Sequence, residues 1–98
     1  MCPSHLKVMK LLWEQGDLTA SQLASILKEQ TNWQRNTSYT VVRDCVARGY
    51  VERIEPRFMC HAIVTLEQMR AYSRKWLVEM LYDGNTWALL DDLKQESI

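Results

Sequence analysis

The sequence predicts a mainly α fold with one small β-hairpin, and three observations support it. Apolar residues recur at helical spacing in three segments before residue 50 and in two segments after residue 65. Between these segments the pattern changes to a period of two, which is typical of strands. The 98 residues are 47% hydrophobic and 24% charged, an ordinary globular composition with room for one compact domain and a short appendage.

The first two helices are delimited by short sequence signals. Pro3 suits the first turn of a helix, and Gly16 is expected to end that helix. Thr19 and Gln22 match a capping box, in which each residue binds the backbone of the other. The second helix is therefore expected over residues 19–30.

A third helix and a hairpin follow. Asn36 is expected to be the N-cap of a helix that ends at Gly49. Residues 50–64 are expected to form two strands, with a turn at residues 55–57 because Pro56 cannot continue a strand. Three helices followed by a hairpin is the order of a winged helix-turn-helix, in which the hairpin is the wing.

The two remaining helices carry apolar stripes that a winged helix does not need. A short chain buries a limited share of its surface, so a leftover stripe favours association with a second copy of the chain. The same residues could line a ligand pocket, although stripes at helical spacing more often form a core. We therefore expect a winged-helix DNA-binding domain over residues 1–64 and a helical dimerisation segment over residues 65–98. The expected dimerisation residues are Met69, Tyr72, Trp76, Leu77, Met80, Trp87 and Leu90.

Short polar side chains gather at the start of the third predicted helix, and arginines flank the predicted wing. A helix that lies in the major groove needs such side chains near its N-terminus, where the helix dipole favours phosphates. Hydroxyls there can instead simply cap the helix, and arginines at a hairpin tip can simply be solvated. Trp33 is expected to pack rather than to contact DNA. The expected DNA-binding residues are Arg35, Asn36, Thr37, Ser38, Thr40, Arg43, Arg53 and Arg57.

The charges are balanced overall but not evenly distributed. Twelve basic and twelve acidic residues give a formal net charge of zero, which argues against a simple polycation that coats nucleic acid. Residues 1–62 hold eight Lys and Arg against six Asp and Glu, whereas residues 63–98 hold four against six. The excess of positive charge therefore lies in the part expected to face DNA.

Several classes of protein are not indicated by the sequence. Cys2, Cys45 and Cys60, with His5 and His61, match no disulfide framework and no metal-ligand spacing, so no metal or other cofactor is expected. No nucleophile–base pair, carboxylate pair or phosphate-binding loop is visible, which argues against an enzyme. No stretch is apolar enough to span a membrane and no secretory signal is seen, so a cytoplasmic protein is expected.

Four stretches in the same order resemble the penicillinase, methicillin-resistance and copper-transport repressors (BlaI/MecI/CopY). They are VMKLLW with LTA, WQRNT, YTVV with RG, and LYDG, at residues 8–13 with 18–20, 33–37, 39–42 with 48–49, and 81–84. The resemblance covers residues 4–93. It implies a transcriptional repressor that binds an inverted-repeat operator as a homodimer, with operator DNA and an inducing protein such as a sensor protease as partners.

Three departures limit what the resemblance implies. The recognition helix has Asp44 at a position that is usually basic, and an acidic side chain there would repel phosphate if it faced DNA. The β-lactam members are cut between an asparagine and a phenylalanine of the last helix, where this chain has Asp92 and Leu93. The copper members bind metal through paired CxC motifs, which this chain lacks.

Two functions from different classes are consistent with these residues. The first is operator binding by a homodimer. The second is a winged-helix protein–protein adaptor without specific DNA binding, which the zero net charge and Asp44 would favour. A sensor of a small molecule or metal would additionally need a pocket between the last two helices.

Overall fold

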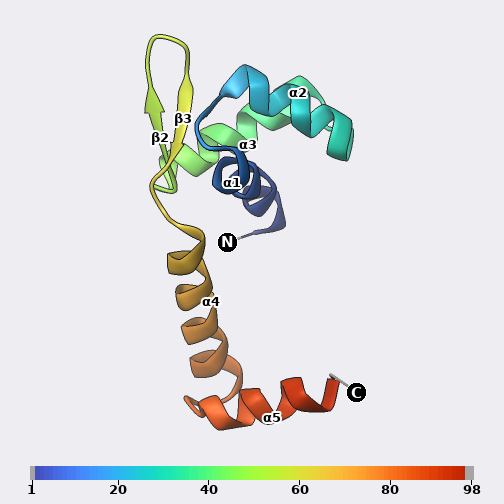
Figure 1. The fold of residues 1–98 in the computed structure, drawn as a ribbon, viewed down its shortest axis with the longest axis vertical. Helices are drawn as coiled ribbons and strands as arrows, with labels where there is room; N and C mark the ends of the chain where they lie inside the picture. Colours follow the sequence, from blue (N-terminus) through green and yellow to red (C-terminus); the bar gives the residue numbers. More distant parts are fainter. Residues whose placement is uncertain (1, 97–98) are drawn as a thin grey trace. The chain divides into compact units, whose positions relative to one another are not determined.

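The computed structural model describes residues 2–96 and divides into two compact units, Met1–Thr65 and Leu66–Ile98. The first unit holds three helices and three strands, and the second holds two helices (Figure 1). The predicted fold class, a mainly helical winged helix-turn-helix with a small antiparallel sheet, is confirmed. Elements of the first unit are α1 (Pro3–Gln15), β1 (Leu18–Thr19), α2 (Ala20–Thr31), α3 (Arg35–Ala47), β2 (Val51–Ile54) and β3 (Met59–Ala62).

The structure contains the features expected to delimit the first two helices. Pro3 occupies the first turn of α1, and Gly16 ends this helix with a positive φ of 80° that favours glycine. The capping box at the start of α2 is confirmed. Thr19 Oγ1 accepts a hydrogen bond of 3.1 Å from the backbone N–H of Gln22, and Gln22 Oε1 accepts one of 2.8 Å from that of Thr19.

The expected start of α3 is wrong by two residues. α3 begins at Arg35, with Gln34 as an N-cap that makes no side-chain hydrogen bond. Asn32 ends α2 in the left-handed conformation, with φ at 61°, and residues 32–34 separate the two helices. Asn36 is therefore inside the first turn of α3 and does not cap it.

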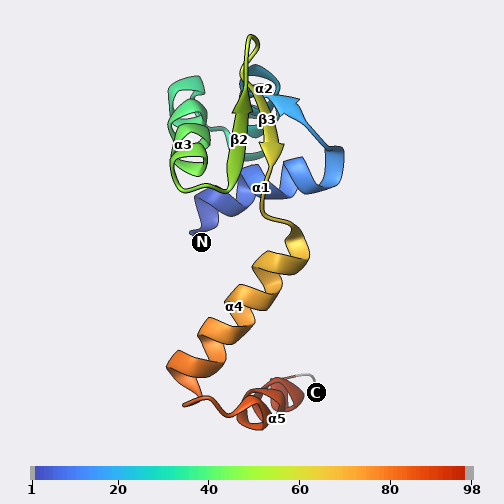
Figure 2. The same ribbon diagram turned by 90° about the vertical axis from the view of Figure 1, so that its left-hand side faces the viewer.

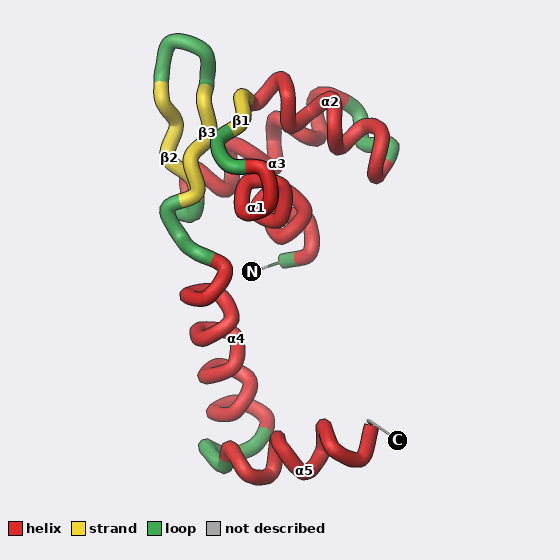
Figure 3. Tube along the Cα trace, in the orientation of Figure 1, coloured by secondary structure: helices red, strands yellow, loops and turns green. Residues whose placement is uncertain are grey.

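The sheet has the order β1-β3-β2 and is antiparallel throughout. The predicted hairpin of β2 and β3 is confirmed, with Val51 opposite Ala62 and Ile54 opposite Met59. The short strand β1 was not predicted, and it pairs with the other edge of β3 (Figure 3). The helices lie on one side of the hairpin, and the tip of the hairpin extends beyond them (Figures 1 and 2).

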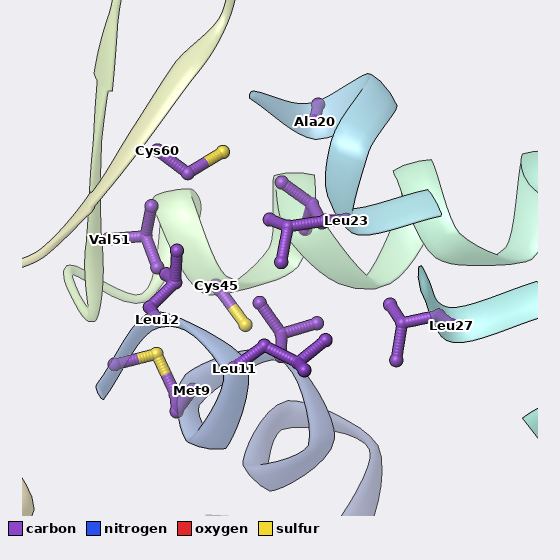
Figure 4. Close-up of a cluster of buried hydrophobic side chains, with 11 residues drawn as sticks. Met9, Leu11, Leu12, Ala20, Leu23, Leu27, Cys45, Val51 and Cys60 are labelled. Carbon is purple, nitrogen blue, oxygen red and sulfur yellow. The ribbon is translucent and has the colours of Figure 1, made fainter. Parts of the chain in front are cut away.

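All three helices and the hairpin contribute side chains to one core (Figure 4). Met9 of α1, Leu23 of α2 and Val42 of α3 are fully buried, as is Cys60 of β3. Trp33 packs against this core as expected. The core fixes α3 from its inner side and leaves its outer side to solvent. The remaining buried members are Val8, Leu11, Leu12, Ala20, Leu27, Cys45 and Val51.

The second unit consists of α4 (Leu66–Leu81) and α5 (Thr86–Glu96). The turn between them contains Gly84, with φ at 81°, whose N–H donates a 2.9 Å hydrogen bond to the carbonyl of Val78. Asn85 Oδ1 accepts a 3.2 Å bond from the N–H of Ala88 and so caps α5. The Tyr82 hydroxyl donates a 2.6 Å bond to Asp92, which links the turn to α5. Within residues 2–96, no helix is long and apolar enough to cross a membrane.

Candidate nucleic-acid interface

The outer side of α3, from its N-terminus to Arg43, presents a polar and basic face. Its inner side is fixed by Ser38, Val42 and Cys45, which recur at helical spacing and are buried. The opposite side is exposed, and it begins at the helix N-terminus, where unpaired N–H groups and the helix dipole favour anions. The exposed residues of this face are Arg35, Asn36, Thr37, Thr40 and Arg43.

Ser38 does not belong to this face, contrary to the expectation from sequence. It is 1% exposed, and its hydroxyl is buried without a hydrogen-bond partner among the described residues. The serine lies four residues before Val42, on the side of α3 that packs against the core. Its side chain therefore cannot reach DNA, and we remove Ser38 from the candidate contacts.

Two arginines of α3 are organised around the ring of Tyr39. The guanidinium of Arg35 lies 5.1 Å from the ring centroid and that of Arg43 lies 5.7 Å from it, within the range of cation–π attraction. Arg35 also donates to the Tyr39 hydroxyl at 3.1 Å and to Ser21 of α2 at 3.2 Å. The Tyr39 ring itself meets Phe58 edge to face, with centroids 6.2 Å apart. These contacts hold both guanidinium groups beside the ring of Tyr39.

The two exposed threonines of this face differ in what they offer to DNA. The Thr40 hydroxyl donates a 2.9 Å bond to the carbonyl of Asn36, so only its acceptor capacity is free. Thr37 makes no such bond within residues 2–96, and its hydroxyl can donate to a phosphate oxygen.

Lys28 is a basic residue near this face that sequence reasoning did not select. It lies in the last turn of α2 and lines a hollow of about 300 Å³ together with Gln34 and Arg35. The hollow is therefore at the turn between the two helices of the helix-turn-helix. A lysine in the last turn before a predicted helix-turn-helix connector was the signal that could have identified it.

The wing carries its two arginines in different states. Arg53 lies 3.7 Å above the centroid of the Phe58 ring and is paired with Glu55. Arg57 is exposed in the turn and makes no hydrogen bond or ion pair within the described part of the chain. The free cation at the tip of the wing is therefore Arg57, whereas Arg53 is already engaged.

Asp44, the acidic residue of α3, is paired with two side chains, His5 and Arg48. His5 of α1 approaches its Oδ2 atom at 2.5 Å, and Arg48 donates from Nε to the same oxygen at 3.0 Å. The hydrogen bond from Arg48 and then that from His5 lower the pKa of Asp44 below its ordinary value of 3.8. The carboxylate is thus ionised at neutral pH and directed toward α1 and the end of α3. The contribution of His5 was not visible in the sequence, because the two residues are 39 positions apart.

The expected dimerisation residues form an exposed apolar surface on α4 and α5, with two exceptions. Trp76 is 51% exposed and Trp87 is 77% exposed, which is unusual for tryptophan. Leu77 is half-buried and Met69 is only 8% exposed, so Met69 has little surface left to bury against a partner. Leu81 and Leu93 are exposed as well and were not expected. The apolar surface as a whole comprises Tyr72, Trp76, Met80, Leu81, Trp87, Leu90 and Leu93.

The buried thiols are not poised for chemistry. Burial raises the pKa of Cys45 to about 12 and that of Cys60 to about 11, so both remain protonated at neutral pH. A protonated thiol is neither a good nucleophile nor a metal ligand. Among residues 2–96, no three His, Cys, Asp or Glu side chains are grouped so that they could hold a metal ion.

Comparison with known families extends over almost the whole chain. The family model described as Penicillinase repressor matches residues 1–97. The match includes the winged helix and both helices of the second unit, so it agrees with the resemblance found in the sequence. A search of curated proteins returned no match.

Proposed function

Because the chain belongs to the penicillinase repressor family, a family of transcriptional repressors, we propose that it binds an inverted-repeat operator as a homodimer. The observation that carries this proposal is the exposed outer side of α3, from Arg35 to Arg43. It combines the positive end of a helix dipole with two held arginines and the free hydroxyl of Thr37, which can donate. Cationic and hydrogen-bond-donating side chains of this kind bind phosphate oxygens and the edges of guanine bases.

In the proposed complex α3 lies in the major groove. Arg43 is long enough to reach a base edge, while Arg35, Thr37 and Lys28 contact phosphates that flank the groove. Arg57, at the tip of the wing, neutralises a phosphate next to the adjacent minor groove. Such a protein acts where the chromosomal DNA is, so we place it in the cytoplasm.

The apolar surface of α4 and α5 supports the dimer. Large apolar side chains left exposed along two successive helices are typical of an interaction site. A second copy covers it with an identical surface through a two-fold axis. The same axis relates two copies of α3, and an inverted repeat offers each copy the same half-site.

A titration of the purified protein against two DNA duplexes tests this function. One duplex carries the sequence upstream of the protein's own gene and the other a scrambled version, and fluorescence anisotropy is measured at two salt concentrations. We expect tight binding to the first duplex that weakens steeply with salt, because bound phosphates release counterions. Equally weak binding to both duplexes contradicts operator binding and favours the protein–protein adaptor.

Two variants then test the residues of the face. Arg43→Ala and Thr40→Ala remove exposed side chains, so both should fold and dimerise normally. We expect Arg43→Ala to weaken operator binding by about 5- to 150-fold, the range for a lost base contact. The control is Lys10→Ala, which removes an equal charge from the exposed side of α1. Equal losses in Arg43→Ala and Lys10→Ala would mean that net charge, and not this face, governs binding.

A further inference from the structure

One buried histidine joins the first helix to the recognition helix. His5 is 6% exposed, and its Nε2 atom lies 2.5 Å from Asp44 Oδ2. An ionised carboxylate only accepts hydrogen bonds, so His5 Nε2 carries the hydrogen and donates it. Arg48 donates to the same oxygen. One oxygen of Asp44 therefore receives two donors, one of which comes from a different helix.

Asp44 stands where a free carboxylate would oppose DNA binding. It is the only acidic residue of α3, and it lies four residues after Thr40, on the same side of the helix. Phosphates near Thr40 would repel an uncompensated charge one turn away. The two donors compensate that charge and hold the carboxylate toward α1.

Among the described residues, the bond to Asp44 is the polar interaction that the His5 ring makes. The ring packs edge to face against Tyr50, with centroids 5.8 Å apart. Its other nitrogen, Nδ1, is buried without a hydrogen-bond partner among residues 2–96. A buried unpaired nitrogen is unfavourable, and a phenylalanine would fill the same space without one. The bond to Asp44 is thus the polar interaction that a histidine gains at this position.

We propose that His5 is a positioning residue for DNA binding that acts through Asp44. By donating to Asp44 it keeps the single negative charge of α3 off the DNA and fixes α1 against the recognition helix. His5 itself touches no DNA. This inference rests on the proposed operator binding.

A double-mutant cycle separates this role from simple packing. The duplex from upstream of the gene is titrated with the full chain, with His5→Phe, with Asp44→Asn and with the double variant, each confirmed to be folded by circular dichroism. His5→Phe keeps a ring but removes the donor. We expect it to weaken binding on the order of tenfold, as for contacting residues in one network. In the Asp44→Asn background, where no charge needs compensation, the same change should cost less than about twofold.

Two further variants complete the design. His5→Gln places an amide donor near the position of Nε2, so it should restore most of the affinity that His5→Phe loses. If the His5→Phe protein does not fold, His5→Leu takes its place as the variant that lacks a donor. Equal losses for the donor-free variant in both backgrounds, or no loss in either, would overturn the role of His5. Failure of the unaltered chain to prefer its own duplex over the scrambled one would instead overturn operator binding itself.

Discussion

Ser38 places a hydroxyl in the core with no hydrogen-bond partner among the described residues. An unpaired buried hydroxyl is unfavourable by about 1–3 kcal/mol, while the methyl group of alanine needs no partner. We expect Ser38→Ala to leave operator affinity unchanged and to leave the free energy of unfolding equal or higher by about 1 kcal/mol. Chemical denaturation and the anisotropy titration measure the two quantities. A Ser38→Ala protein that folds normally but binds the operator tenfold more weakly would return Ser38 to the DNA contacts.

The two arginines of the wing allow a comparison of matched substitutions, because they differ in how they are engaged. Arg57 is free, whereas Arg53 already stacks on Phe58 and pairs with Glu55. Log affinity falls as log salt rises. Arg57→Ala should make this slope shallower by about 0.9, the loss of one phosphate contact, on the operator and on scrambled DNA alike. Arg53→Ala should change the slope less. The opposite order would show that Arg53 leaves Phe58 to bind DNA.

At the scale of elements, the period and the caps of the sequence identified every helix and the hairpin, because those signals are local. The start of α3 was placed two residues late, because its N-cap is Gln34, which makes no side-chain capping bond and is not a preferred N-cap residue. The strand β1 has two residues, too few to show an alternation, and it exists because β3 offers it an edge. Ser38 was misplaced for a different reason. Its polar side chain indicated a surface position, but it recurs at helical spacing with Val42 and Cys45 and packs with them against the core.

His61 and Asp17 join β3 to the turn between α1 and β1 by a 2.8 Å hydrogen bond. That bond, and then the charge of Asp17, raise the pKa of His61 above its ordinary value of 6.5. A pKa raised by folding adds stability that is fully present below pH 6.5 and is lost as pH rises through the folded pKa.

His61→Gln removes the charged partner of Asp17, and its effect is the difference in unfolding free energy between the unaltered chain and the variant. We expect this difference to favour the unaltered chain below pH 6.5 and to shrink as the pH rises, because the charged histidine is what the pair stabilises. Urea denaturation at a series of pH values measures it. A difference that grows with pH would mean that the pair does not favour the charged histidine.

At the scale of the whole molecule, the first unit carries the candidate DNA contacts and the second carries the exposed apolar surface. The amphipathic pattern of the last two helices predicted this division of roles, which stays a prediction, and Trp76 and Trp87 are exposed in the single chain. The His5–Asp44 pair was not predictable, because no local pattern connects residues 39 positions apart. Asp44 thus looked like an obstacle to DNA binding in the sequence, whereas in the fold its charge is compensated.

The apolar surface predicts which variants separate dimerisation from folding. Trp76 is half exposed in the single chain, so its removal should disturb the fold little and the dimer strongly. We expect Trp76→Ala to raise the dimer dissociation constant on the order of 100-fold, as for the loss of a buried tryptophan. Analytical ultracentrifugation measures it, with Arg70→Ala as a control on an exposed polar position of α4. An unchanged dimer in Trp76→Ala would place the interface elsewhere.

The central claim, a homodimer on an inverted repeat, is tested most directly by the mass of the protein–DNA complex. Sedimentation of the complex with the duplex from upstream of the gene gives the number of chains bound to each duplex. The account predicts two chains on that duplex and no defined complex with scrambled DNA at the same salt concentration. A single chain for each duplex, or the same complex with both duplexes, would contradict it.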